Sequence, residues 1–238
     1  MIIGTNEITS NKYKFDYIDV GCKRGSSTHL CRDVLGGSLG LGIDINADHV
    51  ASYSDAGGVG MIADASNLEL PDDIVDFSVL SHILEHLPNL DSVNKVIFES
   101  LRVSRKFVYI VGPFFDEDVY LRSLGLKFFW SDWSFHPSHV RTSDILRAVG
   151  MSGVRCEAEI YGRIPVVDSA DQNLLCVSEP RDQHQHDLRI HKHKTFVSFA
   201  RPLFKEICAI VIKDRTFDLS TARKKLKLDK LIEVRKFN

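Results

Sequence analysis

The chain has 238 residues, of which 44% are hydrophobic and 26% charged, and its formal net charge is −2 at pH 7. This length can bury a full core without disulfide or metal crosslinks. The small net charge excludes a whole-protein electrostatic attraction to nucleic acid or to an anionic membrane. No apolar run is long enough to span a bilayer, and no signal-peptide pattern begins the chain. Five scattered cysteines without a CxxC pair favour reduced thiols in a cytoplasmic protein.

Short apolar runs alternate with amphipathic stretches through the first half of the chain. The apolar runs predict strands at residues 17–20, 39–45, 60–63, 75–80 and 107–111. The stretches between them predict helices at residues 26–35, about 47–55 and 90–101. Strands that are apolar on both faces and alternate with helices are typical of a parallel sheet covered by helices.

The second half adds one helix and two closing strands. A helix is predicted at 142–150, where Gly150 ends it, and strands at 154–160 and 206–212. The stretch 161–205 is too long for a hairpin loop and contains the polar run PRDQHQHDLRIHKHK, so we expect an exposed insertion or flap. The basic tail TARKKLKLDKLIEVRKFN predicts a solvated helix or strand. We therefore expect one α/β domain over residues 1–238, with seven mostly parallel strands, the last antiparallel, and helices on both faces.

The loop after the first predicted strand, in YIDVGCKRGSS, has the outline of a nucleotide-binding turn. A dinucleotide fingerprint needs G-x-G-x-x-G, and Lys23 occupies the second glycine position. The remaining pattern is an acid, Asp19, followed by Gly21 and Gly25. A second acid, Asp44, ends the next predicted strand, where a carboxylate can accept hydrogen bonds from both hydroxyls of a ribose.

Four segments in this order, IDVGCKRGSS, GLGIDIN, IADAS and DFSVLSHILEHLPN, resemble class I S-adenosylmethionine-dependent methyltransferases. They are similar to the small-molecule branch with the methyltransferase domain 11-like pattern, and HPSHVRTSDILRAVGM is similar to a later segment of that branch. The resemblance covers roughly residues 16 to 155. It implies a Rossmann-like fold, methyl transfer as the activity and S-adenosylmethionine as the cofactor.

The resemblance also implies roles for the loop after the first strand. Asp19, Gly21 and Gly25 would line the methionine end of the cofactor. Lys23 stands where the family usually has a glycine that lets the backbone approach the ligand. A lysine there is compatible with binding if its side chain points outward, and it could attract the carboxylate of the cofactor.

The later strand ends are assigned to the rest of the cofactor in the same way. The resemblance implies that Asp44 holds the ribose and that Ile45 packs on the adenine. Asp64 would face the adenine amino group, with a backbone contact from Ala65. Ser81, just past the fourth strand, would lie near the methyl group.

Several ionisable side chains are candidates for the catalytic step. A hydroxyl acceptor benefits from a general base, and the candidates are His82, Glu85, His86, His136 and His139. His82 ranks first because it directly follows the fourth strand. For His86, a hydrogen-bonded packing role is the main alternative.

A metal-binding variant of the same segment is an alternative. Some methyltransferases that act on vicinal hydroxyls resemble it as E-x-x-E-H plus a later histidine, and they bind a divalent metal. Here His82 replaces the first glutamate, with His136 or His139 as the later ligand, and such a set suits zinc or a transition metal better than magnesium. We assign S-adenosylmethionine as the cofactor and assign no metal ligands.

The predicted function is methylation of a small molecule or a glycan, at a hydroxyl. An aromatic run follows the fifth strand and could pack in the core or wall the acceptor pocket: Phe128, Phe129, Trp130, Trp133 and Phe135. One alternative is an RNA or protein methyltransferase that uses the basic tail residues Arg223, Lys224, Lys225 and Lys227. Another is a non-catalytic partner subunit with a degenerate cofactor loop at Lys23.

Overall fold

Eight strands form the main sheet in the computed structural model, which describes residues 1–9 and 14–238 and, for residue 9, the backbone alone. Their order across the sheet is β10 (Lys230–Phe237), β7 (Cys156–Asp168), β9 (Ser198–Ile212), β5 (Ser104–Pro113), β4 (Val75–Ser81), β1 (Tyr17–Val20), β2 (Gly40–Asp44) and β3 (Val59–Ile62). The five strands from β5 to β3 are parallel, and β9 is antiparallel to β5. Every residue of β1 is buried, as expected for a strand covered on both sides.

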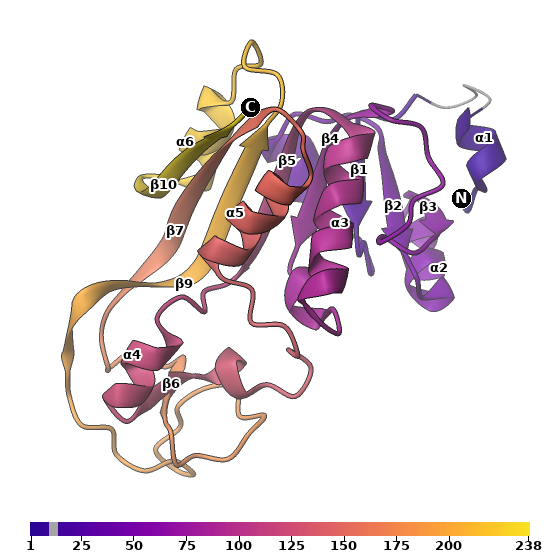
Figure 1. Ribbon diagram of the computed structural model, residues 1–238. Helices are drawn as coiled ribbons and strands as arrows, with labels where there is room; N and C mark the ends of the chain where they lie inside the picture. Colours follow the sequence, from indigo (N-terminus) through magenta and orange to yellow (C-terminus); the bar gives the residue numbers. More distant parts are fainter. Residues whose placement is uncertain (10–13) are drawn as a thin grey trace.

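Helices cover both faces of this sheet, which confirms the predicted arrangement (Figure 1). One apolar cluster joins the sheet to α3 (Leu90–Val103) and α5 (Thr142–Met151), and α1 (Thr5–Thr9) contributes Ile8 to it. A second cluster joins the opposite face to the π-helix η1 (Leu30–Val34) and to α6 (Ser220–Leu226). The remaining helix on that face is α2 (Ala47–Asp55), whose Tyr53 packs against Gly42 of β2.

Two details differ from the sequence-based expectation. The sheet has eight strands rather than seven because part of the basic tail, β10, pairs antiparallel with β7. The helix expected at 26–35 begins only at Thr28, and its second part is η1, in which the Leu35 N–H donates to the Leu30 carbonyl at 3.0 Å. Ser27 precedes that helix, and its hydroxyl donates to the buried carboxylate of Asp19 at 2.5 Å.

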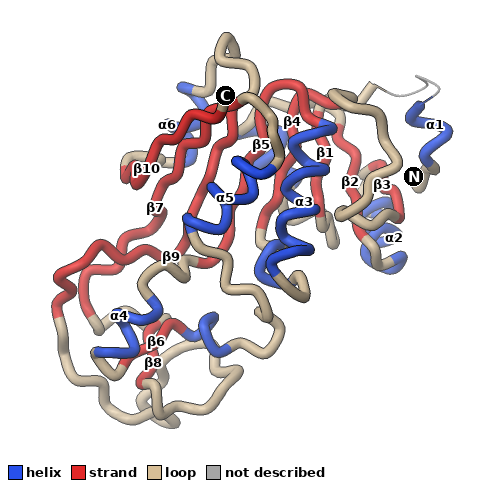
Figure 2. The backbone as a smooth tube through the Cα atoms, viewed as in Figure 1, coloured by secondary structure: helices blue, strands red, loops and turns tan. Residues whose placement is uncertain are grey.

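An outer lobe, made of residues 114–136 and 169–197, lies beyond the far ends of β7 and β9 (Figures 1 and 2). It contains α4 (Asp118–Ser123), the 3-10 helix η3 (Phe129–Asp132), and the strands β6 (Leu126–Phe128) and β8 (Leu174–Cys176). Antiparallel pairing of β6 with β8 joins the two segments. The buried ammonium of Lys127 ties them further, since it donates to Asp132 Oδ2 at 2.7 Å and to the Glu179 carbonyl at 2.5 Å.

The stretch 161–205, expected as an insertion or flap, is only partly irregular. Its ends are strand, because β7 and β9 continue their antiparallel pairing as far as Asp168 and Ser198. Its middle supplies β8 and the histidine-rich run to the outer lobe. The longest described helix, α3, has 14 residues, and none of the described helices is long and apolar enough to cross a membrane.

Candidate active site

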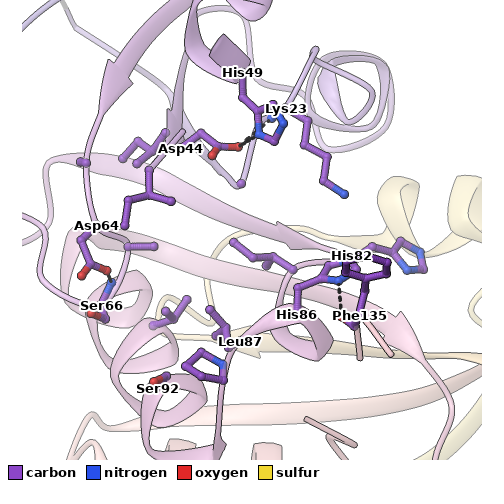
Figure 3. Close-up of a pocket in the computed structure, with 18 of the residues that line it drawn as sticks. Lys23, Asp44, His49, Asp64, Ser66, His82, His86, Leu87, Ser92 and Phe135 are labelled. Atoms are coloured by element: carbon purple, nitrogen blue, oxygen red, sulfur yellow. Dashed lines mark hydrogen bonds and ion pairs between the residues drawn. The ribbon is translucent and has the colours of Figure 1, made fainter. Parts of the chain in front are cut away.

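A cleft of about 690 Å³ opens at the carboxyl ends of β1, β2, β3 and β4. Parallel strands of an open sheet bring the residues that follow them to one crevice. The volume lies in the range of roughly 300–1,000 Å³ that is usual for small-molecule sites. Eight residues proposed from the sequence line this cleft, and Figure 3 shows most of them: Gly21, Lys23, Asp44, Ile45, Asp64, Ala65, His82 and His86.

The loop after β1 reaches the cleft through Gly21 and Lys23. Gly21 has a φ of +70°, and a Cβ at this position would lie 2.6 Å from Ile83 Cδ1. Lys23 also has a positive φ, 44°, although a non-glycine residue in this left-handed conformation costs about 1–2 kcal/mol. Its side chain is exposed and extends in the direction of His82 in Figure 3. Lys23 therefore keeps the left-handed backbone conformation that a glycine would adopt at this position, and its side chain points away from the loop.

Asp44 forms the centre of the cleft. Its Oδ2 accepts a hydrogen bond from the Lys23 backbone N–H at 3.3 Å and lies 3.1 Å from Nδ1 of His49. Its Oδ1 accepts from the Asn46 N–H at 2.9 Å. Oδ1 keeps a second acceptor position, and Oδ2 gains one if His49 turns away, so Asp44 can accept from hydroxyl groups of a ligand. The adjacent Ile45 is 72% exposed, an apolar side chain available to cover a flat ring.

The end of β3 provides the other wall. Asp64 is exposed, its Oδ1 accepts from the Ser66 N–H at 2.8 Å, and Ala65 is half-buried beside it. From one end to the other, the cleft therefore presents loop backbone, a carboxylate, an exposed apolar side chain and a second carboxylate. This sequence of groups fits an adenosine that carries an extended polar tail.

Asp19 lies behind the loop rather than in the cleft. It is 1% exposed, its Oδ2 accepts from Ser27, and its Oδ1 has no partner among the described residues. Burial raises the pKa of Asp19 to about 6, against the opposing effect of the Ser27 hydrogen bond. The side chain shapes the loop from beneath, so its expected contact with the cofactor is not direct in this geometry.

His82 stands between two carboxylates at the end of β4. Its φ is 51°, a strained value of the kind found at functional sites. Nε2 lies 3.5 Å from Glu206 Oε1, and Nδ1 lies 3.3 Å from Glu85 Oε1. Hydrogen bonds to Glu206 and then to Glu85 raise the pKa of His82 to about 9, although burial opposes them. A histidine protonated at neutral pH donates from both nitrogens, which counts against the general-base role expected for His82.

Glu206 extends this charged network across the sheet. It belongs to β9, and its Oε2 lies 3.0 Å from Nη1 of Arg163 on β7. Burial tends to raise the pKa of Glu206, but the hydrogen bond from His82 and the charge of Arg163 outweigh burial and lower it. Glu85, in the 3-10 helix η2 (Leu84–His86), is 2% exposed. The network holds His82 in one orientation.

A second cavity of about 460 Å³ lies between this network and the outer lobe. It shares His82, His86 and Trp133 with the first cleft, so the two spaces adjoin. The residues of the aromatic run differ in burial. Phe128 and Trp130 are buried, at 1% and 6% exposed, whereas Phe135 is 70% exposed and lines the first cleft. Besides His82 and His86, the polar side chains of the second cavity are Glu85, His136, Asn173, His184, Lys205 and Glu206.

The remaining proposed residues lie outside both cavities. Gly25, with a φ of +83°, forms the turn of the loop, and Ser81 is the last residue of β4. The His139 ring stacks on Phe115 at a centroid distance of 4.4 Å, and its Nδ1 lies 3.4 Å from Asp118 Oδ2. The structure therefore brings His82, Glu85, His86 and His136 together and separates His139 from them.

Three residues of this site are not predicted by the sequence patterns. Glu206 and Arg163 fall within an expected closing strand and an expected insertion, and His49 within an expected helix. Only Glu206 has a signal in the sequence that could have identified it: it is a glutamate at the start of the otherwise apolar run EICAIVI. A charge at the end of a buried strand usually faces a partner.

The buried carboxyl of Asp19 predicts a pH-dependent gain of stability in Asp19→Asn. The folded-state pKa of about 6 exceeds the ordinary value of 3.8. At a pH above about 6 the carboxyl is charged in the folded state, and burial of this charge lowers the free energy of unfolding. At pH 7 the variant should be more stable by up to about 3 kcal/mol, and this gain should vanish below about pH 4. Denaturant unfolding at both pH values measures it, with the exposed Asp48→Asn as control. Equal differences at both pH values would contradict the assignment.

Comparison with known proteins agrees with this geometry. Residues 18–110 match the family model described as a methyltransferase domain. A methyltransferase dependent on S-adenosylmethionine (SAM) from Archaeoglobus fulgidus superposes with a TM-score of 0.56 at 17% identity, over 88% of this chain and 92% of that one. The YcgJ protein of Bacillus subtilis superposes with a TM-score of 0.55 at 15% identity, over 88% and 97%. A SAM-dependent methyltransferase structure from Methanosarcina mazei gives 0.50 at 15% identity, over 90% and 99%.

At these identities the solved structures establish the fold alone, and the family match is confined to residues 18–110. The search of curated proteins found no match. The matched segment runs from β1 to β5 and contains the whole loop after β1, Asp44, Asp64 and His82. Residues 18–110 therefore resemble this methyltransferase domain, and the chain has the fold of the S-adenosylmethionine-dependent methyltransferases to which it is similar.

Proposed function

We propose that the protein is an S-adenosylmethionine-dependent methyltransferase and that it methylates a small molecule or a glycan, at a hydroxyl group. The observation that supports this most directly is the pair of adjoining cavities, which share His82, His86 and Trp133. The second cavity has aromatic walls and a few polar side chains, a combination suited to one ring- or sugar-sized acceptor. We treat the outer lobe as an acceptor-binding insertion of a single methyltransferase domain.

The residues of the first cleft fit S-adenosylmethionine, which supplies an electrophilic methyl group when bound. Asp44 would accept hydrogen bonds from the ribose hydroxyls, and Ile45 would cover the adenine. Gly21 and the backbone of Lys23 leave room for the methionine end. Methyl transfer depends mainly on orientation, so the protein contributes a fixed geometry and aromatic walls that exclude water.

His82 is our candidate for the residue that orients the acceptor. It lies where the two cavities meet, and the carboxylates of Glu206 and Glu85 fix its ring. A fixed N–H donor at this junction would hold the acceptor oxygen in line with the methyl group.

The alternative of an RNA or protein acceptor has less support. The basic residues of the tail lie on and beside α6, near the end of the sheet opposite the outer lobe (Figure 1). Two of them are already engaged, since Arg223 pairs with Glu159 at 2.8 Å and Lys225 donates to the Asp33 carbonyl. The described cysteines are all free, which supports our proposal of the cytoplasm as the compartment.

The acceptor proposal is tested by transfer of a radiolabelled methyl group from S-adenosylmethionine into separated cell fractions. We expect label in the small-molecule or glycan fraction, in a product that survives mild alkali as a methyl ether does. Label that enters RNA or protein instead would refute the proposal. Label released by alkali would place the methyl group on a carboxylate.

Asp44→Ala should weaken S-adenosylmethionine binding by at least tenfold and leave the fold intact. Each charge-assisted hydrogen bond to a ribose hydroxyl contributes about 1.5–3 kcal/mol. Calorimetric titration measures the affinity, and circular dichroism checks the fold. Asp48→Ala removes a nearby carboxylate outside the cleft and should bind normally. Unchanged affinity in Asp44→Ala would mean that the ribose is held elsewhere.

His82→Ala should lower kcat roughly a hundredfold and change cofactor affinity little, because the orienting contact is made to the acceptor. His82→Asn should recover part of the rate, since asparagine donates a hydrogen bond and tolerates the left-handed backbone. Steady-state kinetics of the three enzymes make the comparison. Full activity in His82→Ala would exclude the role.

A further inference from the structure

We propose that Glu85, His86 and His136 form a binding site for a divalent transition-metal ion, with zinc as the first candidate. One potential ligand atom from each residue lies within 4.8 Å of the others. Glu85 and His86 come from η2, and His136 comes from the loop after η3. The topology therefore brings together two segments 50 residues apart in the chain.

The two histidines are arranged as metal ligands usually are. His86 Nδ1 lies 2.9 Å from the Phe135 carbonyl oxygen, and His136 Nδ1 lies 3.1 Å from the Trp130 carbonyl oxygen. A carbonyl oxygen only accepts, so in both rings Nδ1 carries the proton and Nε2 keeps its lone pair. Metal-binding histidines characteristically donate their other N–H to a backbone carbonyl or a carboxylate, which fixes the tautomer and the ring orientation.

Glu85 supplies the negative charge of the group. Its side chain is 2% exposed, and its Oε2 has no hydrogen-bond partner among the described residues. Leaving a buried carboxylate oxygen unpaired is costly. A cation bound between Glu85 and the two histidines would satisfy it.

The donor set indicates the metal class. Two imidazole nitrogens and one carboxylate suit zinc and related transition metals, and three protein ligands leave a fourth position open. Ligand atoms on one tetrahedral zinc ion lie about 3.3 Å apart, so small side-chain rotations close the group. All three residues line the second cavity, so the open position faces that cavity.

The group keeps Glu85, His86 and His136 from the metal alternative considered from the sequence and leaves out His82 and His139. His82 has both ring nitrogens directed at carboxylates, and His139 Nδ1 lies beside Asp118, so neither belongs to the group. A separate pair, His186 and His191, stacks in the histidine-rich run with ring centroids 5.6 Å apart. That pair provides a matched control.

Calorimetric titration of Zn²⁺ into untagged, chelator-treated full-length protein tests the proposal. We expect one tight site per chain in the wild type. His136→Ala and His86→Ala should each weaken zinc binding at least tenfold, the range found when a ligand shell is damaged. His86 is exposed, so His86→Ala should fold even if His136→Ala does not.

His186→Ala should bind zinc as the wild type does. Absence of a tight site in the wild type, unchanged affinity in folded His86→Ala, or loss of binding in His186→Ala would each overturn the proposal. The readout is metal binding alone, so the result is independent of which acceptor the enzyme methylates.

Discussion

The strands β3, β2, β1 and β4 run parallel, and their carboxyl ends therefore lie along one edge of the sheet. This constraint collects Asp64, Asp44, Gly21 and His82 from positions that span more than 60 residues of the chain. The backbone supports the collection locally. Gly21 and Lys23 both adopt left-handed conformations, and the Lys23 N–H bonds directly to Asp44. His82, at the same edge, also has a strained positive φ, which destabilises the backbone locally.

The antiparallel strand β9 completes the site in a different way. It runs back along β5 and carries Glu206 to His82, while its far end and that of β7 lead to the outer lobe. The lobe brings Trp133 and His136 over the strand ends, and the hydrogen bond from the buried Lys127 ammonium to the Glu179 carbonyl helps to join its two segments. The first cleft is thus built mainly from the sheet, and the second cavity lies between the sheet and the lobe.

The sequence predicts the first cleft better than the second cavity. Strand periodicity and the acids at the strand ends follow local rules, so the amino-acid pattern alone places Asp44, Asp64 and His82 at one edge. It does not place Glu206 and Arg163, because their role depends on a strand register that only tertiary packing sets. The tail strand β10 escapes prediction for the same reason. The sequence leaves the choice between His136 and His139 open, because that choice depends on loop geometry.

A crystal structure with S-adenosylhomocysteine would test the central claim most directly. We expect that both ribose hydroxyls bond to Asp44, that Ile45 covers the adenine, and that the sulfur points past His82 toward the second cavity. The protein would be expected to keep the positive φ of Lys23. A ligand seated away from Asp44, or a sulfur atom directed away from the second cavity, would contradict the claim.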